Sequence, residues 1–456
     1  MVEAAPARSA RVRAATVALV VAAAAGIGAF AWFRIWQARV GNPLIWQDSL
    51  EYQALSRQPL LSHRIWAGAR PPVTPLLWKL AGSDTTFALV QTLVSVAAWS
   101  TLAVVAARRV RPWWGRLGAG AAVLGFAATR PVTQWDRSVL SESLSLALLA
   151  LLFAVAILWA ARPTLTRGLG VVAVGLLFAA TRDTQIWVIA LVAVAFGAYA
   201  AWRGLRVDAI SARPALVVAG GLVAVVVLTG AGSIASHRDV KNVENALAVR
   251  VFPYPSRIAW FGDHGMPQAA RLTKLARAKA AEPGHAPVVT IDPADPAFGP
   301  LVRWMRSDAT RTYVQWLLFH PATVLTEPLA RPERSFNNAD GHLSFYAASD
   351  RTDAPVLTTI LYPSWPWVLV AAFVAVAGGV YLGHDRRPDW AVIALLGALG
   401  LVHMLIAWHG DGMEATRHAN VGNVQVRLGV LLLLVLLLDG RQPASADQPL
   451  VSINPS

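Results

Sequence analysis

The chain has 456 residues, of which 55% are hydrophobic and only 14% are charged. Soluble domains carry about 25% charged residues, so this composition indicates a polytopic membrane protein and excludes a large soluble core. Cysteine is absent, which excludes disulfides, a thiolate metal site and a cysteine nucleophile.

Six uncharged apolar runs are long enough to cross a bilayer as a helix, which takes about 20 residues. They are residues 14–33, 85–107, 143–161, 184–202, 214–236 and 354–383. Shorter candidates need snorkelling flanks or polar residues inside the span, and they are residues 117–129, 168–181, 390–408 and 421–438. We therefore predict an all-α polytopic membrane protein with about ten transmembrane helices.

The first run has two arginines before it, Arg11 and Arg13, as a secretory signal peptide would. It is longer than the usual apolar core of such a peptide. Bulky residues (WFRIW, 32–36) also follow where small cleavage-site residues belong. These features favour a retained anchor over a cleaved signal.

The net charge of +14 would indicate nucleic-acid binding in a soluble protein, but here it follows the positive-inside rule, and we expect no nucleic acid. With the N-terminus inside, the inner connections are basic; they hold Arg108, Arg109, Arg111, Arg116, Arg162, Arg167, Arg203, Arg206, Arg213, Arg386 and Arg387. The acids there are Asp208, Asp385 and Asp389. The loop at 37–83 is an exception, being basic yet assigned outside. An even number of helices places both termini in the cytoplasm.

Four parts follow from this topology. Residues 1–236 form a transmembrane module of about seven helices with an outer loop at 37–83, and 237–353 form an outer segment of mixed structure. Residues 354–440 form a second transmembrane module of about three helices, and 441–456 form a cytoplasmic tail.

Within the outer segment, residues 267–300 are rich in Ala, Pro and Lys and are interpreted as a mobile surface excursion. Residues 301–320 place Trp304, Tyr313 and Trp316 at helical spacing. That spacing fits an amphipathic helix on the membrane interface, or equally a helix packed on the segment's own core.

The outer connections differ from the inner ones because they carry acids together with arginines. They hold Asp48 and Glu51, then Arg130, Asp136, Arg137 and Glu142, then Arg182 and Asp183, then Asp411, Glu414, Arg417 and His418. Their recurrence on one membrane face predicts an active site at the bilayer surface.

In a helix, Asp48, Glu51 and Tyr52 would share one face. A carboxylate at a membrane interface, beside Trp and Tyr, is partly desolvated and becomes a competent general base. The alternative for Asp48 is a helix N-cap.

Arg130 and Arg182 each end a copy of the sequence FAATR (126–130 and 178–182), which indicates a duplicated helical hairpin or a coincidence in an Ala-rich chain. Guanidiniums bind phosphate in a bidentate fork. The alternative for each arginine is a snorkelling helix end.

Glu142 opens an apolar helix, where an acid is favourable as part of a capping turn. Glu414 and Arg417 have the spacing of a local ion pair. Arg427 lies inside an apolar run and costs roughly 2.5–3.5 kcal/mol unless it faces a cavity or a partner, so it predicts a cavity at that level. No residue spacing demands a metal ion.

The chain resembles the GT-C superfamily of integral membrane glycosyltransferases, such as the protein O-mannosyltransferases, the aminoarabinose transferases and the bacterial arabinosyl- and mannosyltransferases. The resemblance covers most of the chain by architecture, through short motifs. These are Asp48, Glu51 and Tyr52 after the first helix, then Arg70-Pro-Pro72 and Pro75-Leu-Leu-Trp78, Leu140-Ser-Glu142-Ser-Leu144, Tyr313…His320-Pro321, and Asp411…Glu414…Arg417-His418.

The resemblance implies a hexosyl- or pentosyltransferase that moves a sugar, with inversion, from a polyprenyl-phosphate donor to a glycan, lipid or protein acceptor on the outer face. Asp48 would be the general base, with Glu51 as the second catalytic acid, although Ser49 stands where some members have an adjacent acid. The donor phosphate would bind Arg130, Arg182, Arg417 and Arg427. Substrate contacts would come from Tyr52, Asp136, Glu142, Asp183, Asp411, Glu414 and His418. No cofactor and no metal are expected.

Two other classes stay open. An envelope polysaccharide polymerase or ligase would also use outer arginines on a lipid-linked sugar, but would depend less on an early acidic base. A lipid or solute transporter would place polar groups near the bilayer midplane, whereas here the ionisable groups lie mostly at one rim.

Overall fold

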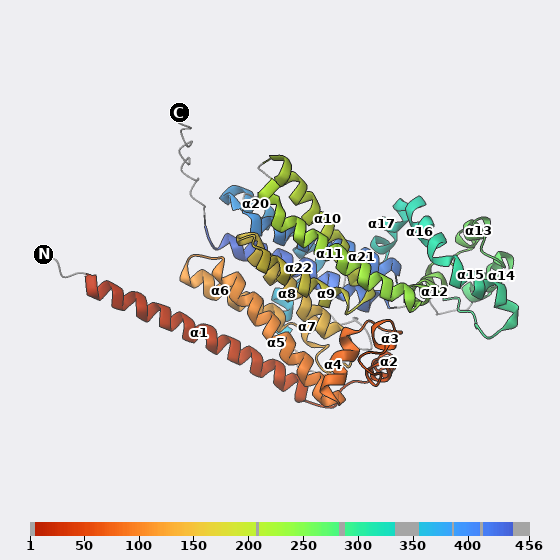
Figure 1. Cartoon of the computed structure of the whole chain (residues 1–456), viewed down its shortest axis with the longest axis horizontal. Helices are drawn as coiled ribbons and strands as arrows, with labels where there is room; N and C mark the ends of the chain where they lie inside the picture. Colours follow the sequence, from red (N-terminus) through yellow and green to blue (C-terminus); the bar gives the residue numbers. More distant parts are fainter. Residues whose placement is uncertain are drawn as a thin grey trace.

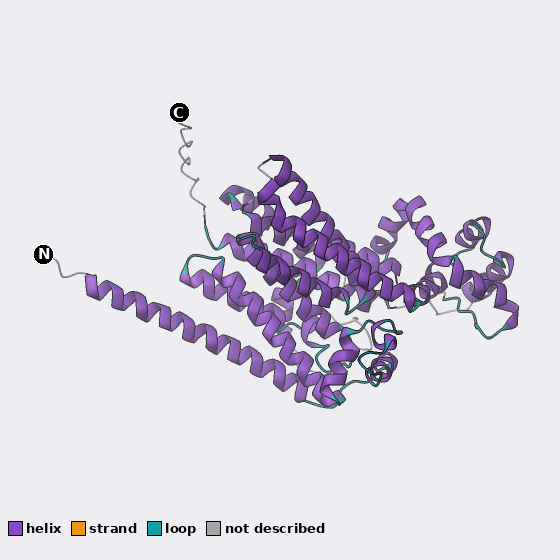
Figure 2. Cartoon of the chain, in the orientation of Figure 1, coloured by secondary structure: helices purple, strands orange, loops and turns teal. Residues whose placement is uncertain are grey.

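The computed structural model describes residues 5–206, 209–281, 288–332, 355–384, 387–410 and 414–440. Within these ranges the chain is helical apart from turns and loops (Figure 2) and one isolated bridge between Leu44 and Ser138. Long helices form a bundle, and short helices gather at one end of it (Figure 1).

Ten apolar helices make up the bundle. They are α1 (Ala5–Arg39), α5 (Asp84–Arg108), α6 (Trp113–Ala127), α8 (Glu142–Ala161), α9 (Leu165–Ala179), α10 (Asp183–Arg206), α11 (Ala209–Ala235), α20 (Trp365–Leu382), α21 (Pro388–Gly410) and α22 (Ala415–Leu437). Eight are long and apolar enough to cross a membrane. The other two, α6 and α9, have 15 residues each. The prediction of an all-α polytopic membrane protein is therefore confirmed.

One predicted span is divided in the structure. The apolar run 354–383 becomes α19 (Pro355–Leu361) and α20, with Pro363 between them and Pro366 in the first turn of α20. Proline lacks the backbone donor that a continuous helix needs and is well placed in a first turn. The prediction of one helix over this run was wrong for that reason.

Four short helices lie in the predicted outer loops that connect helices of the bundle. They are α2 (Gln47–Ser56), α3 (His63–Trp66), α4 (Val73–Ala81) and α7 (Arg130–Thr133). The backbone of Leu44 is tied to the segment before α8, because its N–H donates to the Arg137 carbonyl at 2.9 Å and its carbonyl accepts from Val139 at 3.0 Å. This tie holds the start of α2 beside the start of α8.

The outer segment is a helical cluster with its own core. It contains α12 (Arg238–Arg250), α13 (Pro255–Asp263), α14 (Ala269–Ala280), the 3₁₀ turn η1 (Pro296–Phe298), α15 (Gly299–Ser307), α16 (Ala309–Phe319) and α17 (Pro321–Ala330). Trp304, Tyr313 and Trp316 are buried in that core, so the second of the two alternatives for residues 301–320 holds. Part of the predicted surface excursion is helix α14.

The outer segment is attached to the end of α21. The Tyr313 hydroxyl donates to the carbonyl of His409 at 2.9 Å, and Arg250 Nε donates to the carbonyl of Trp408 at 2.8 Å. The Arg250 guanidinium also lies 4.0 Å from the ring centroid of Trp408. These contacts hold α12 over the end of the bundle.

Helices α21 and α22 approach closely through glycines. A Cβ added to Gly400 would lie 2.7 Å from the carbonyl oxygen of Gly422, and one added to Gly429 would lie 2.6 Å from the Cα of Gly397. Small residues permit such backbone contact between membrane helices. The contact sets the position of α22, whose first turn carries Arg417.

A buried ion pair joins α1 to the segment before α8. Arg34 and Asp136 are 0% and 1% exposed. The guanidinium donates to both carboxylate oxygens at 2.7 and 2.8 Å, and to the Ala127 carbonyl and the Ser95 hydroxyl. Asp136 therefore joins α1 to the segment before α8, and the substrate contact expected of it from the sequence stays a prediction.

We expect Asp136→Leu to lower the free energy of unfolding by about 3–5 kcal/mol, because it leaves the buried charge of Arg34 without its partner. The double variant Arg34→Met/Asp136→Leu should recover most of this loss, since it leaves neither charge. Thermal unfolding of the purified protein in one detergent would measure both. A double variant no more stable than the single one would contradict the pairing.

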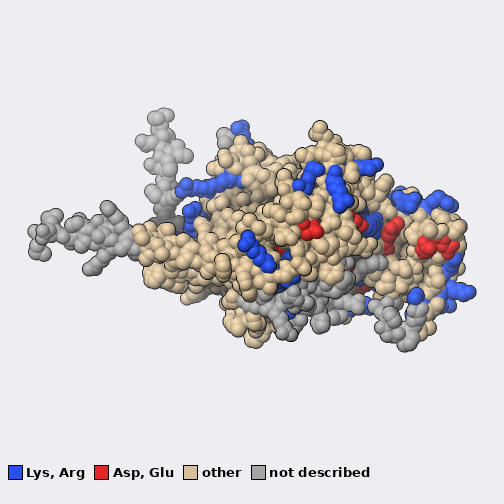
Figure 3. Space-filling model, turned by 90° about the horizontal axis from the view of Figure 1, so that it is seen from below, with Lys and Arg blue, Asp and Glu red and all other residues tan. Residues whose placement is uncertain are grey.

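The basic turns meet at the end of the bundle opposite the outer segment. Arg109 Nε lies 2.7 Å from Asp389 Oδ2, and Arg387 Nη1 lies 3.1 Å from Asp439 Oδ2. The first described residues of α1 and the last of α22 lie at the same end (Figure 1). On the face in Figure 3, the acidic side chains in view lie toward the outer segment. Basic side chains lie at both ends of that face, and the orientation of the predicted topology stays a prediction.

The cysteine-free chain allows that orientation to be tested with single cysteines. Leu61, before α3, is 99% exposed, and Leu205, near the end of α10, is 86% exposed. With an impermeant thiol reagent on intact cells, Leu61→Cys should label and Leu205→Cys should label only after permeabilisation. The reverse pattern would invert the topology.

Candidate active site

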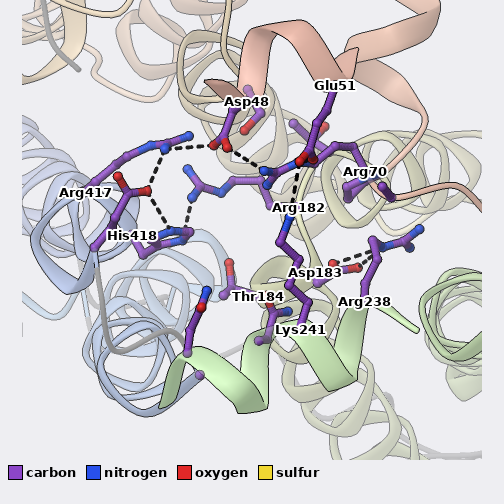
Figure 4. Close-up of a pocket in the computed structure, with 18 of the residues that line it drawn as sticks. Asp48, Glu51, Arg70, Arg182, Asp183, Thr184, Arg238, Lys241, Arg417 and His418 are labelled. Atoms are coloured by element: carbon purple, nitrogen blue, oxygen red, sulfur yellow. Dashed lines mark hydrogen bonds and ion pairs between the residues drawn. The ribbon is translucent and has the colours of Figure 1, made fainter. Parts of the chain in front are cut away.

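A cavity of about 420 Å³ lies where α2, α12 and the ends of α10, α21 and α22 converge. It is lined by five basic side chains, by four carboxylates and by a histidine; these are Arg70, Arg182, Arg238, Lys241 and Arg417, then Asp48, Glu51, Asp183 and Glu414, then His418. Figure 4 shows these groups pointing toward one another from separate elements. Oppositely charged side chains from five separate parts of the sequence thus share one cavity.

Helix α2 presents Asp48, Glu51 and Tyr52 to the cavity, as the helical spacing predicted. Ser49 supports the start of this helix, because its hydroxyl accepts from the Trp46 N–H at 3.0 Å and donates to the Val139 carbonyl at 2.8 Å. The N-cap position considered for Asp48 is held by Trp46, and Ser49 bonds the Trp46 N–H from the third position of the helix. The Asp48 carboxylate is left to face the cavity.

Asp48 bridges two arginines that come from opposite ends of the chain. Its Oδ1 accepts from Arg70, and its Oδ2 accepts from Arg417 Nη1 at 2.9 Å. Arg70 also donates through Nε to Glu51 at 2.6 Å. The arrangement holds the carboxylate by charge-assisted bonds on both oxygens, in a cavity open to a substrate.

Behind this layer, Glu142 is fully buried and holds two arginines. Its Oε1 accepts from Arg182 Nη1 at 2.7 Å and from Arg417 Nε. Glu142 is not among the residues that line the cavity, and the substrate contact expected of it stays a prediction. Because one carboxylate orients two guanidiniums, both are held in place before any ligand arrives.

His418 completes the arrangement on α22. Its Nδ1 lies 2.6 Å from Arg182 Nη2, and its Nε2 lies 3.8 Å from Glu414. Glu414 in turn accepts from Arg417 at 2.7 Å. The local ion pair of Glu414 with Arg417, considered from their spacing, is present and is part of a larger network.

Helix α12 forms the opposite wall of the cavity. Arg238, Lys241, Asn242 and Asn245 line it, at spacings that put them on one face of a helix. Lys241 Nζ lies 3.2 Å from Glu51 Oε1, and Arg238 Nε lies 3.1 Å from Asp183 Oδ2. This wall was not predicted from the sequence, although a polar helix directly after a transmembrane run was a usable signal.

Two groups that line the cavity from outside the membrane spans have shifted pKa values. Burial raises the pKa of Tyr52, so its hydroxyl stays a neutral donor. Burial would lower the pKa of Arg70, but the nearby carboxylates of Asp48 and Glu51 outweigh it and raise that pKa above its ordinary value. Arg70 is therefore a permanent cation next to Asp48; its guanidinium carbon lies 5.8 Å from the Tyr52 ring centroid.

Two of the arginines expected to bind phosphate lie away from this cavity. Arg130 begins α7, and its backbone N–H donates to Thr358 at 3.0 Å. Arg427 is buried against the Tyr362 and Trp365 rings, at 4.1 and 5.0 Å, and donates to the Pro363 carbonyl. The interior charge of Arg427 is thus compensated by aromatic rings and a carbonyl, so it does not require the cavity that we predicted for it.

The two copies of the FAATR repeat have the same sequence, but their arginines lie in different surroundings. Both α6 and α9 have 15 residues and end at the alanine after the phenylalanine. Arg130 itself begins the short helix α7, with Pro131 in its first turn, whereas Arg182 precedes the long helix α10, which begins at Asp183. Among the described residues that line the cavity, only the second arginine of the repeat appears.

Asp411 lies outside the described residues, so its predicted role stays a prediction. Among the residues that the structure describes, no group of three or more acids and histidines is placed to hold a metal ion. The expectation that no metal is needed stays a prediction as well.

The fold and the site define an all-α polytopic membrane protein with a charged cavity at one end of its bundle. No protein-family model matches the chain, and no curated protein matches it. Two solved structures are similar to 89% of it at 12% identity.

The first is the archaeal oligosaccharyltransferase AglB from Archaeoglobus fulgidus in complex with an inhibitory peptide and a dolichol-phosphate, with a TM-score of 0.39 and 50% of that chain covered. The second is the oligosaccharyltransferase from the same organism tethered to an acceptor peptide, with a TM-score of 0.38 and 49% covered. The chain thus spans about half the length of these proteins, at TM-scores too low to establish a shared fold.

Proposed function

We propose that this protein is a GT-C-type membrane glycosyltransferase that transfers a sugar from a polyprenyl-phosphate donor to an acceptor on the outer face of a bacterial plasma membrane. The observation that carries the proposal is the single cavity in which Asp48 lies among preorganised guanidiniums. A proton acceptor beside fixed cations is what displacement of a phosphate leaving group by a hydroxyl requires.

In this mechanism Asp48 takes the proton of the acceptor hydroxyl as its oxygen attacks the anomeric carbon. The bond from that carbon to the phosphate oxygen breaks, configuration inverts, and polyprenyl phosphate leaves. Negative charge grows on the phosphate as the bond breaks, and Arg182 lies in the cavity to stabilise it. Glu142 and His418 hold Arg182 in position beforehand, so little reorganisation is needed at the moment of reaction.

Glu51 and Arg417 have supporting roles in the same proposal. Glu51 links Arg70 to Lys241 across the cavity, which positions the acceptor side. Arg417 already contacts Asp48, Glu142 and Glu414, so it orients the base in addition to contributing charge.

The two arginines of the FAATR repeat provide a matched test. In proteoliposomes supplied with polyprenyl-phosphate sugars, Arg182→Gln should lower the rate of polyprenyl phosphate release about a hundredfold or more, the usual cost of losing one such electrostatic contact. Arg130→Gln should keep most of the activity, because Arg130 lies outside the cavity lining. Equal losses in both variants, or no transfer from any such donor, would contradict the proposed function.

A further inference from the structure

A second, apolar cavity adjoins the charged one. It has a volume of about 410 Å³ and lies between the first outer loop, α9 and α11. Its walls include Trp66, Leu76, Leu176, Leu228 and Gly232. We call it the apolar groove. Because α11 is a candidate membrane span and Leu176 and Leu228 are exposed, the groove opens at the depth of the bilayer.

The two cavities share part of their lining, namely Pro71, Asp183 and Arg238. Arg238 Nε lies 3.2 and 3.1 Å from the two carboxylate oxygens of Asp183, and its Nη1 donates to the Gly68 carbonyl at 2.7 Å. The Asp183–Arg238 ion pair therefore stands at the junction between the apolar groove and the charged cavity. Figure 4 shows this ion pair among the residues of the charged cavity.

An apolar groove that adjoins a charged cavity fits a ligand with a hydrocarbon chain and an anionic head. We propose that the apolar groove holds the chain of a lipid phosphate, and that Arg238 binds its phosphate by exchanging the Asp183 carboxylate for it. Asp183 is then a competing anion that occupies Arg238 while no lipid phosphate is bound. The proposal rests on the proposed function for the identity of the lipid, a polyprenyl phosphate.

Electrostatics gives the direction of the exchange. In the structure, Asp183 forms an ion pair with Arg238, whose side chain is nearly buried. A phosphate at the junction would also come near Lys241, one turn further along the same face of α12. The phosphate offers more acceptor oxygens than a carboxylate, and a guanidinium can bind two of them at once. Asp183 would repel it, so the acid that looks like part of the site lowers the affinity for the ligand.

Removing the charge of Asp183 should therefore strengthen lipid phosphate binding, whereas removing the charge of Arg238 should weaken it. Binding of a long-chain polyprenyl monophosphate to the purified full-length protein would be measured by native mass spectrometry. Asp183→Asn should bind it roughly fivefold more tightly, and Arg238→Gln roughly tenfold more weakly. The matched polyprenol should respond to neither variant, because it has no charge. Inorganic phosphate should compete poorly, because it lacks the chain.

Two glycines on α11 supply the control for the chain. A Cβ on Gly232 would lie 3.6 Å from the Trp66 carbonyl oxygen, within the apolar groove, whereas a Cβ on Gly230 would have nothing within 4 Å. Gly232→Leu should therefore weaken binding of both the polyprenyl phosphate and the polyprenol. Gly230→Leu should leave both unchanged.

The outcomes separate this inference from the proposed function. Unchanged or weaker lipid phosphate binding in Asp183→Asn would overturn the exchange, and equal binding in the two glycine variants would overturn the groove, even if sugar transfer is active. The expected binding pattern together with no sugar transfer would instead support the lipid phosphate site and contradict the transferase.

Discussion

Replacing Asp48 by Asn should lower the rate of sugar transfer about a hundredfold to ten thousandfold, the usual contribution of a positioned general base. The amide keeps the shape of the side chain but does not accept a proton at neutral pH. The change is measured as the initial rate of sugar transfer in proteoliposomes at saturating donor. A thermal melt of the same sample shows whether the contacts to Arg70 and Arg417 still support the fold.

Asp84→Asn is the matched control for this experiment. Asp84 begins α5 in the same region of the protein, accepts from Gln53 and Trp78, and does not line the charged cavity. Its variant should transfer sugar at nearly the normal rate. Full activity in Asp48→Asn would remove the proposed mechanism and favour a polymerase or ligase that depends on the arginines instead.

The second large effect is expected at Glu142, which touches no substrate in the proposed mechanism. Glu142→Gln removes a carboxylate charge that faces both Arg182 and Arg417 through one oxygen. We expect a loss of roughly 3 kcal/mol in the free energy of unfolding, the lower end for breaking a buried ion pair, because the amide oxygen still accepts a hydrogen bond. Sugar transfer should fall as well, since both guanidiniums lose their orientation.

Glu414→Gln serves as its control, because Glu414 contacts the same Arg417 at 2.7 Å but is 24% exposed, whereas Glu142 is 0% exposed. Solvent screens the partly exposed pair, so this variant should change the free energy of unfolding by about 1 kcal/mol or less. Thermal unfolding in a single detergent compares the two. Equal destabilisation of the two variants would show that the burial of Glu142 does not determine how much its ion pairs contribute to the free energy of unfolding.

Much of the charged cavity could be anticipated from residue types and their position along the chain. The helical spacing of Asp48, Glu51 and Tyr52 predicted a shared face, and α2 presents all three to the cavity. Arg182 and Arg417 were expected beside them because ionisable groups are tolerated at the ends of membrane helices far better than inside them. Their roles in chemistry stay predictions.

The sequence could not separate residues that line the cavity from residues that support it. Asp136 and Glu142 look like their neighbours in sequence, yet one anchors Arg34 and the other orients two arginines behind the cavity wall. The partner of Asp136 is 102 residues away in the chain, and no local pattern reports a pairing across that distance.

The sequence by itself determined that this is an all-helical membrane protein with basic connections at one end and mixed charges at the other, because apolar run length and charge placement respond directly to the bilayer. Only the tertiary structure decided that Arg182 enters the charged cavity while Arg130 does not, and that Arg238 closes its far side. Those outcomes depend on which helices pack together, and packing is set by contacts such as the glycine approach of α21 to α22, which join residues distant in sequence.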